Sequence, residues 1–109
     1  MSDAAELRVV LVTAPGLEVA RSLAHALVEA KLAACVNLIG GLRSFYVWKG
    51  ELCDEAEVQL VIKTRVERLD ALGAWLDANH PYDVPEVLHL QVAGGSQKYL
   101  SWLEAQTGG

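Results

Sequence analysis

The chain has 109 residues, of which 52% are hydrophobic and 21% charged, and its formal net charge is −5. This composition excludes a disordered chain. Its scattered Lys and Arg residues argue against a nucleic-acid partner, which requires a basic face. No apolar run approaches the roughly 18 residues that a membrane span needs, so we expect no membrane partner either.

The size and hydropathy of the chain indicate one self-associating domain. We expect a single domain over 1–109 with an ordered core of about 7–104. A domain of this size buries only about two-thirds of its unfolded surface, and the mean hydropathy of +0.24 exceeds what one small core accommodates. The N-terminal residues do not resemble a signal peptide. We therefore expect a cytoplasmic protein whose Cys35 and Cys53 are free thiols.

The first half of the chain predicts a strand, a helix and a long hairpin. Residues 7–12 are a β-branched apolar run typical of a central strand, and residues 17–32 have helical periodicity, with Thr13 as the expected cap. Residues 33–48 read as a strand interrupted at Gly40-Gly41, a typical bulge signal. A tight turn at Lys49-Gly50 leads into a returning strand over residues 51–63.

The position of the turn sets the pairing of the hairpin. If the turn centres on Lys49-Gly50, paired residue numbers sum to about 99, which places Cys35 opposite Thr64 and Cys53 opposite Tyr46. The two thiols are then about eleven positions, or roughly 36 Å, apart along the ladder. That separation argues against an intrachain disulfide.

The second half repeats the pattern of helix and strand. Thr64-x-x-Glu67 predicts a capping box for a helix that ends before His80-Pro81. Residues 87–92 alternate as a strand, and Ser96 is expected to cap a short C-terminal helix. The order βαββαβ predicts an α+β, ferredoxin-like sandwich with both helices on one face of an antiparallel sheet. The other face then needs a partner.

No familiar catalytic motif is present, so we expect a binding protein and not an enzyme. The chemically dense segment is His80-Pro-Tyr-Asp-Val-Pro-Glu, in which two prolines hold an imidazole, a phenol and two carboxylates. Cys35 is either simple core packing or a metal donor together with His80, because thiolate and imidazole suit copper or zinc. Two ligands are too few for a closed site. A third donor would come from Glu86, solvent or a neighbouring subunit.

Five segments in the same order and spacing resemble the CutA divalent-cation tolerance proteins. They are Ala33-Ala-Cys-Val-Asn, Trp48-x-Gly-x-Leu, Glu57-Val-Gln-Leu-Val-Ile-Lys-Thr, His80-Pro-Tyr-x-x-Pro-Glu and Tyr99-Leu-Ser-Trp-Leu. The resemblance implies a ferredoxin-like subunit in a PII-like homotrimer, with hairpins joining sheets between subunits. It also implies a role in tolerance of divalent cations, copper especially.

The resemblance also implies site residues. Cys35 and His80 match the metal donors, whereas Val12 and Asn79 replace a second cysteine and a second histidine found in some relatives. This chain therefore lacks two soft donors of the fullest copper set. The positions that match an intersubunit cleft are Trp48, Glu57, Lys63, Tyr82 and Glu86.

Three functions are consistent with these observations. The first is a homotrimeric protein that binds copper or another divalent cation, with no organic cofactor. The second is a PII-like regulator that binds a small anionic metabolite through Lys63 and Tyr82. The third is a structural trimeric adaptor.

Overall fold

The computed structural model describes residues 4–108 and has the predicted α+β, ferredoxin-like architecture. Residues 1–3 and 109, part of the expected domain, lie outside the described residues. A short 3-10 helix over Ala4–Glu6 precedes the first strand, and another over Val66–Arg68 precedes the second helix. The main elements are β1 (Leu7–Ala14), α1 (Leu17–Glu29), β2 (Cys35–Trp48), β3 (Glu51–Arg65), α2 (Leu69–Asn79), β4 (Leu88–Gln91) and α3 (Gln97–Thr107).

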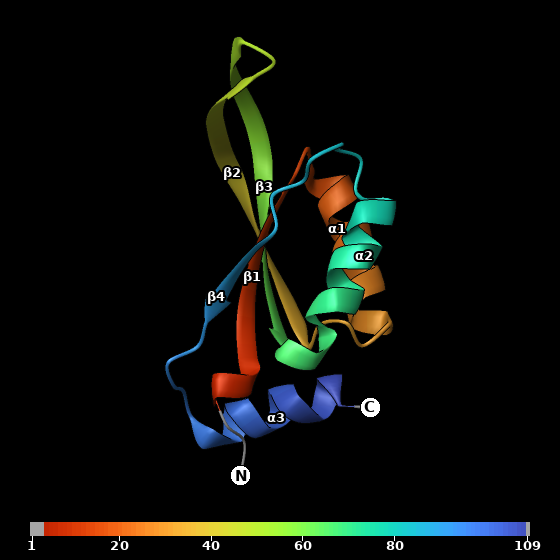
Figure 1. The fold of residues 1–109 in the computed structure, drawn as a ribbon, viewed down its shortest axis with the longest axis vertical. Helices are drawn as coiled ribbons and strands as arrows, with labels where there is room; N and C mark the ends of the chain where they lie inside the picture. Colours follow the sequence, from red (N-terminus) through yellow and green to blue (C-terminus); the bar gives the residue numbers. More distant parts are fainter. Residues whose placement is uncertain (1–3, 109) are drawn as a thin grey trace.

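The four strands form one antiparallel sheet in the order β2-β3-β1-β4. Helices α1 and α2 lie together on one face of this sheet, as predicted (Figure 1). Alternate strand residues, such as Val10 and Leu60, point toward the helices and are fully buried. Leu72 and Leu76 of α2 complete this core from the helix side. Within residues 4–108, none of the helices is long and apolar enough to cross a membrane.

Helix α1 buries a narrower stripe than the sequence suggests. Ala20, Leu23 and Leu27 are buried, at the spacing of a helix that faces a core. Leu17, which was expected to share that stripe, is 56% exposed because it is the first residue of the helix and lies at its open end. His25 lies on the exposed face, as predicted, with Nδ1 3.7 Å from the Glu29 carboxylate.

The β2-β3 hairpin turns at Lys49-Gly50, as predicted. Both residues have positive φ, +51° and +81°, which is typical of the two-residue turns whose twist matches the strands. Cys53 pairs with Tyr46, in the expected register. Both cysteines are free.

Beyond the glycine pair the expected register is wrong by one residue. Cys35 pairs with Lys63 and not with Thr64, because β2 has two residues between Ile39 and Leu42 where β3 has only one between their partners Gln59 and Glu57. Gly41 has φ +77°, the conformation that lets the extra residue be accommodated as a bulge.

Both predicted threonine caps are wrong for the same reason. Thr13 and Thr64 lie inside strands, where each is buried, and neither caps a helix. The Thr64 hydroxyl donates to the Leu32 carbonyl oxygen at 2.7 Å and so ties β3 to the segment after α1. The strands continue past the apolar runs because the sheet supplies hydrogen bonds to their polar residues as well.

Helix α3 lies at the end of the sheet opposite the hairpin tip (Figure 1). The Ser96 hydroxyl caps it, as predicted, by accepting from the Tyr99 backbone N–H at 3.2 Å. Leu100 and Leu103 pack against Leu7 and Ala34 in a second, smaller core.

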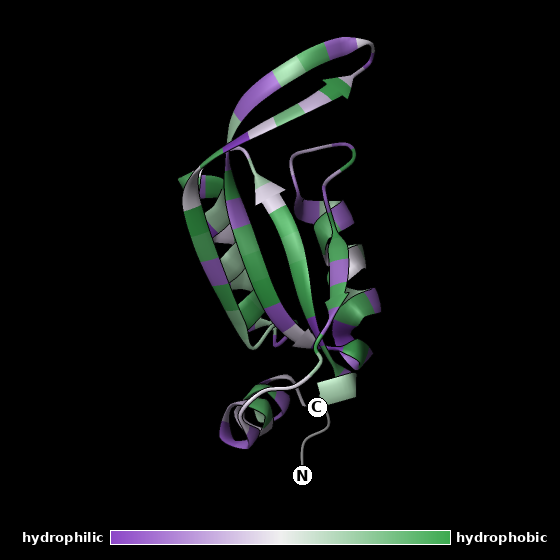
Figure 2. Cartoon of the chain, turned by 90° about the vertical axis from the view of Figure 1, so that its left-hand side faces the viewer, coloured by the Kyte–Doolittle hydropathy of each residue, from purple (hydrophilic) through white to green (hydrophobic). Residues whose placement is uncertain are grey.

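The distal half of the hairpin extends well beyond the sheet, and the molecule measures 48 × 25 × 22 Å. Figure 2 looks onto the sheet face that the helices leave open and shows that apolar residues predominate on its central strands. The large apolar side chains most exposed on this face are Ile39 (54%), Leu88 (55%) and Leu90 (46%). The structure thus has the open apolar face that the element order predicts.

Candidate functional site

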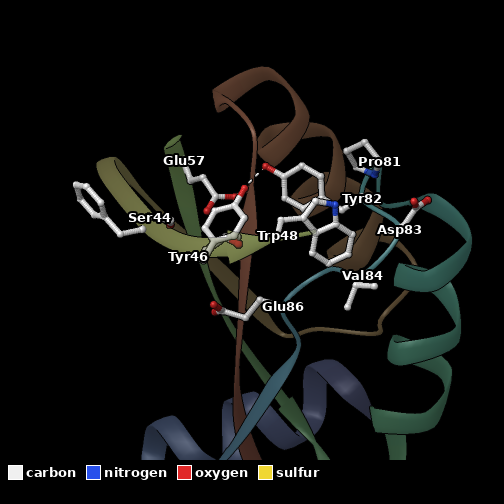
Figure 3. A pocket seen from close by; sticks show the side chains of 11 residues that line it. Ser44, Tyr46, Trp48, Glu57, Pro81, Tyr82, Asp83, Val84 and Glu86 are labelled. Carbon is white, nitrogen blue, oxygen red and sulfur yellow. Dashed lines mark hydrogen bonds between the residues drawn. The ribbon is translucent and has the colours of Figure 1, made fainter. Parts of the chain in front are cut away.

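A pocket of about 630 Å³ lies where the projecting hairpin meets the loop between α2 and β4 (Figure 3). The hairpin contributes aromatic residues from one side, and the loop contributes a phenol and two carboxylates from the other. The lining residues are Thr13, Ser44, Phe45, Tyr46, Trp48, Glu57, Pro81, Tyr82, Asp83, Val84 and Glu86.

His80 fixes the loop at its start. Pro81 forces His80 out of the helical region, to ψ 140°, which ends α2 and turns the imidazole inward. Its Nε2 donates to the Thr13 carbonyl oxygen at 2.8 Å, and its Nδ1 accepts from the Tyr82 backbone N–H at 3.1 Å. Because Nδ1 faces an N–H donor, it carries no proton, and the ring is the neutral Nε2–H tautomer. The imidazole is 7% exposed and both its nitrogens are occupied.

Tyr82 and Glu57 form the polar centre of the pocket. The Tyr82 hydroxyl donates to Glu57 Oε2 at 2.8 Å, and Figure 3 shows this bond across the pocket wall. Burial, followed by the hydrogen bond to Glu57 and its charge, raises the pKa of Tyr82 well above its usual value of 10.0. The phenol therefore stays protonated and acts as the donor. Glu57 is only 6% exposed, so the bond holds a buried carboxylate in one orientation.

The pocket has a negative electrostatic character. Glu57, Asp83 and Glu86 all line it, whereas the lining contains no Lys or Arg. The pKa of Tyr46 is raised by desolvation and then by its acidic neighbours Cys53, Glu55 and Glu57, of which Glu57 lines the pocket. An anionic ligand does not match this charge.

The second group of predicted residues lies elsewhere. Cys35 pairs with Lys63 near the far end of the sheet, and the Lys63 ammonium is 3.9 Å from the Cys35 sulfur and also donates to Asn37 Oδ1. Burial and the nearby Cys35 raise the pKa of Tyr99 on α3. Within one chain, Lys63 therefore does not line the pocket around Tyr82, and its place in a cleft between subunits stays a prediction.

Cys35 and His80 are not brought together within one chain. His80 contacts Thr13, which pairs with Gln59, whereas Cys35 pairs four residues further along β3. Four strand residues span about 13 Å. Among residues 4–108, no three His, Cys, Asp or Glu side chains are grouped closely enough to hold a metal ion. The donors of a single chain therefore do not fit a copper site.

Of the predicted pocket residues, Trp48, Glu57, Tyr82 and Glu86 meet in the pocket. Sequence reasoning missed Tyr46, although it is two residues before Trp48 and so lies on the same face of β2. It named Asp83 as a carboxylate of the proline-bounded loop but did not include it among the pocket candidates. The two-residue period of the strand could have indicated Tyr46, and the composition of the loop could have indicated Asp83.

The topology and the hairpin-loop pocket define a class: ferredoxin-like α+β subunits with an extended β2-β3 hairpin. Residues 8–106 match the family described as CutA1 divalent ion tolerance protein, and the chain belongs to this family. Divalent-cation tolerance protein CutA of Thermus thermophilus is 48% identical over 92% of this chain and 97% of that protein.

Other relatives extend the comparison. The chain is 48% identical, over 91% of its length, to Protein CutA, chloroplastic, of Arabidopsis thaliana, but it spans only 54% of that longer protein. The crystal structure of CutA1 from Oryza sativa superposes with a TM-score of 0.91 at 46% identity, covering 96% of this chain and 97% of that one. The fold and the family are thus shown over nearly the whole chain.

Proposed function

We propose that this chain is a cytoplasmic, homotrimeric divalent-cation tolerance protein that acts by binding and not by catalysis. The observation that carries the proposal is the projecting hairpin. One of its faces carries Tyr46 and Trp48, which line the pocket, and the opposite face exposes the cross-strand pair Val47 and Leu52. These two residues are 66% and 77% exposed in the single chain.

An exposed apolar ribbon of this length needs a partner, because such edges otherwise aggregate. The open sheet face beside it presents a second apolar surface, so two complementary surfaces occur on one chain. Head-to-tail contact between two different surfaces closes into a ring when the rotation is suitable. A trimer is the ring that the family resemblance implies. The two free thiols support a reducing compartment.

We propose that the divalent cation binds to the assembled trimer and not to a single chain. Because one chain has no grouped donor set among its described residues, a bound divalent cation, copper included, takes ligands from more than one chain. Cys35 is the better candidate of the two predicted donors, since both nitrogens of His80 are already hydrogen-bonded.

Competition titrations with a Zn(II) chelator and, because copper is Cu(I) under reducing conditions, with a Cu(I) chelator test this. We expect Cys35→Ser to weaken Cu(I) binding by the assembled protein at least tenfold and His80→Ala to change it less than twofold. Cys53→Ser is the matched control, since that thiol lies in the distal hairpin. Equal binding by wild type and Cys35→Ser would remove Cys35 from the site, and loss of binding in His80→Ala alone would reverse the assignment.

A further inference from the structure

The hairpin-loop pocket combines two features that both attract cations. Its lining has three carboxylates and no Lys or Arg, and it has the rings of Tyr46, Trp48 and Tyr82. Carboxylates attract positive charge directly, and the face of an aromatic ring does so through its quadrupole, Trp most strongly. A cation with an apolar body suits this lining better than any anion does.

The spacing of the carboxylates indicates which kind of cation the pocket binds. Figure 3 shows Asp83 on one side of Trp48 and Tyr82, and Glu57 and Glu86 on the other. A metal ion needs its oxygen ligands within about 2.6 Å, and no three acidic side chains among residues 4–108 are grouped for that. Separated negative charges with aromatic surface between them match a ligand that carries separated positive charges on an apolar chain.

We propose that this pocket binds a linear aliphatic diamine or polyamine. One ammonium group lies against Glu57 and Glu86, the methylene chain crosses the rings of Trp48 and Tyr82, and a second ammonium reaches Asp83. Glu57 is the fixed anchor, because Tyr82 holds its Oε2 and leaves Oε1 free of the hydrogen bonds found among the described residues. The inference rests on the geometry of one chain and needs neither the trimer nor a bound metal.

Calorimetric titration of the assembled wild-type protein with four probes tests it, three of which share a four-carbon chain. These are 1,4-diaminobutane, spermidine, 1-butylamine and butane-1,4-diol. We expect the diamine and spermidine to bind at least about fivefold more tightly than butylamine, since the second ammonium adds an ion pair. Butane-1,4-diol has the same length and no charge, and we expect it to give no heat.

Two pairs of variants locate the site. Trp48→Leu keeps the apolar volume but loses the π face, and we expect it to weaken diamine binding about fivefold or more. Trp102→Leu on α3 is its matched control, since Trp48 is 43% and Trp102 44% exposed. Asp83→Asn should bring diamine affinity close to that of butylamine, whereas Glu29→Gln, on the outer face of α1, should not change it.

The same titrations with Ca²⁺ and Cu²⁺ test whether the pocket is instead a simple metal site. Diamine binding that Trp48→Leu and Trp102→Leu leave equally intact would overturn the proposal, as would binding of the metals but not of the amines. Absence of binding by wild type, together with a lower assembly mass for Trp48→Leu, would assign the pocket to the subunit interface and would also overturn it. Native mass spectrometry of each variant provides that mass.

Discussion

At the scale of single residues, the pocket depends on a hydrogen bond between a buried carboxylate and a half-buried phenol that lie far apart in the sequence. Glu57 lies in β3 and Tyr82 in a loop 25 residues later, yet the phenol and the carboxylate share a 2.8 Å hydrogen bond. His80, two residues before Tyr82, is held by the Thr13 carbonyl. The loop is therefore fastened to the sheet at two points, which makes the pocket wall rigid.

Tyr82→Phe should destabilise the protein by about 1–3 kcal/mol, because it removes the phenol that donates a hydrogen bond to the Glu57 carboxylate, which is 6% exposed. Equilibrium unfolding in urea at pH 7 measures this. Tyr46→Phe, at a residue that is 41% exposed, is the control and should stay within about 0.5 kcal/mol of wild type. Equal stability of both variants would mean that water replaces the hydroxyl at no cost.

The Tyr82 phenol also predicts how stability depends on alkaline pH. Its pKa is raised in the folded protein, mainly by burial, so the folded state holds this proton where the unfolded state releases it. Its contribution is complete below pH 10 and is lost as the pH rises above 10. Urea unfolding at pH 9 and pH 11 should show a larger loss of stability for wild type than for Tyr82→Phe. Parallel losses would contradict this assignment.

His80→Ala should cost about 1–3 kcal/mol, since it leaves the Tyr82 N–H and the Thr13 carbonyl without their partner. His25→Ala is a fitting control, because the His25 side chain is 79% exposed. The free energy of unfolding from urea titrations separates them. Equal stability of the two variants would show that His80 does not hold the loop to the sheet.

At the scale of elements, the order of strands and helices could be predicted from the sequence, whereas the ends of β1 and β3 could not. The capping pattern Thr64-x-x-Glu67 is present in the sequence, but Thr64 remains in β3 because Leu32 offers its hydroxyl a better partner there. That partner comes from a distant part of the chain, which a local pattern does not report. The same holds for Lys63, whose pairing moves by one residue through the bulge.

The pocket, too, could be predicted only in part from local sequence patterns. Trp48 and Glu86 belong to recognisable motifs, but the charge of the site follows from which side chains meet in three dimensions. An expected cation, Lys63, is directed to Asn37 at the other end of the sheet. Within one chain, the pocket around Tyr82 therefore has no Lys or Arg in its lining to match the anionic metabolite of the second predicted function. The sequence positions of Lys63 and of the Tyr82 loop could not show that the two lie apart in one chain.

The bulge itself gives a prediction at this scale. Gly41→Ala should destabilise the protein by about 1–2 kcal/mol, because φ is +77° there and a Cβ is unfavourable in that conformation. Gly40→Ala is the control: a Cβ at Gly40 meets nothing within 4 Å and its φ is not positive. Thermal or urea unfolding compares them. Equal effects of the two changes would show that the bulge relaxes freely.

At the scale of the whole molecule, the hairpin explains both the pocket and the expected assembly. Its inner face lines the pocket with Tyr46 and Trp48, and its outer face presents Val47 paired with Leu52. A single chain leaves both this outer face and the open apolar face of the sheet in water. The function proposed for the chain therefore depends on a second surface that only another copy supplies.

We propose that this outer hairpin face drives trimer formation. Sedimentation velocity at micromolar protein concentration measures the mass of the assembly and tests this proposal most directly. Wild type should sediment with three times the 11.8 kDa chain mass, and the double variant Val47→Asp, Leu52→Asp should sediment with a smaller mass. Val28→Asp, at a residue that is 42% exposed on α1, should leave the trimer intact. A wild-type monomer, or an unchanged trimer in the double variant, would contradict the account.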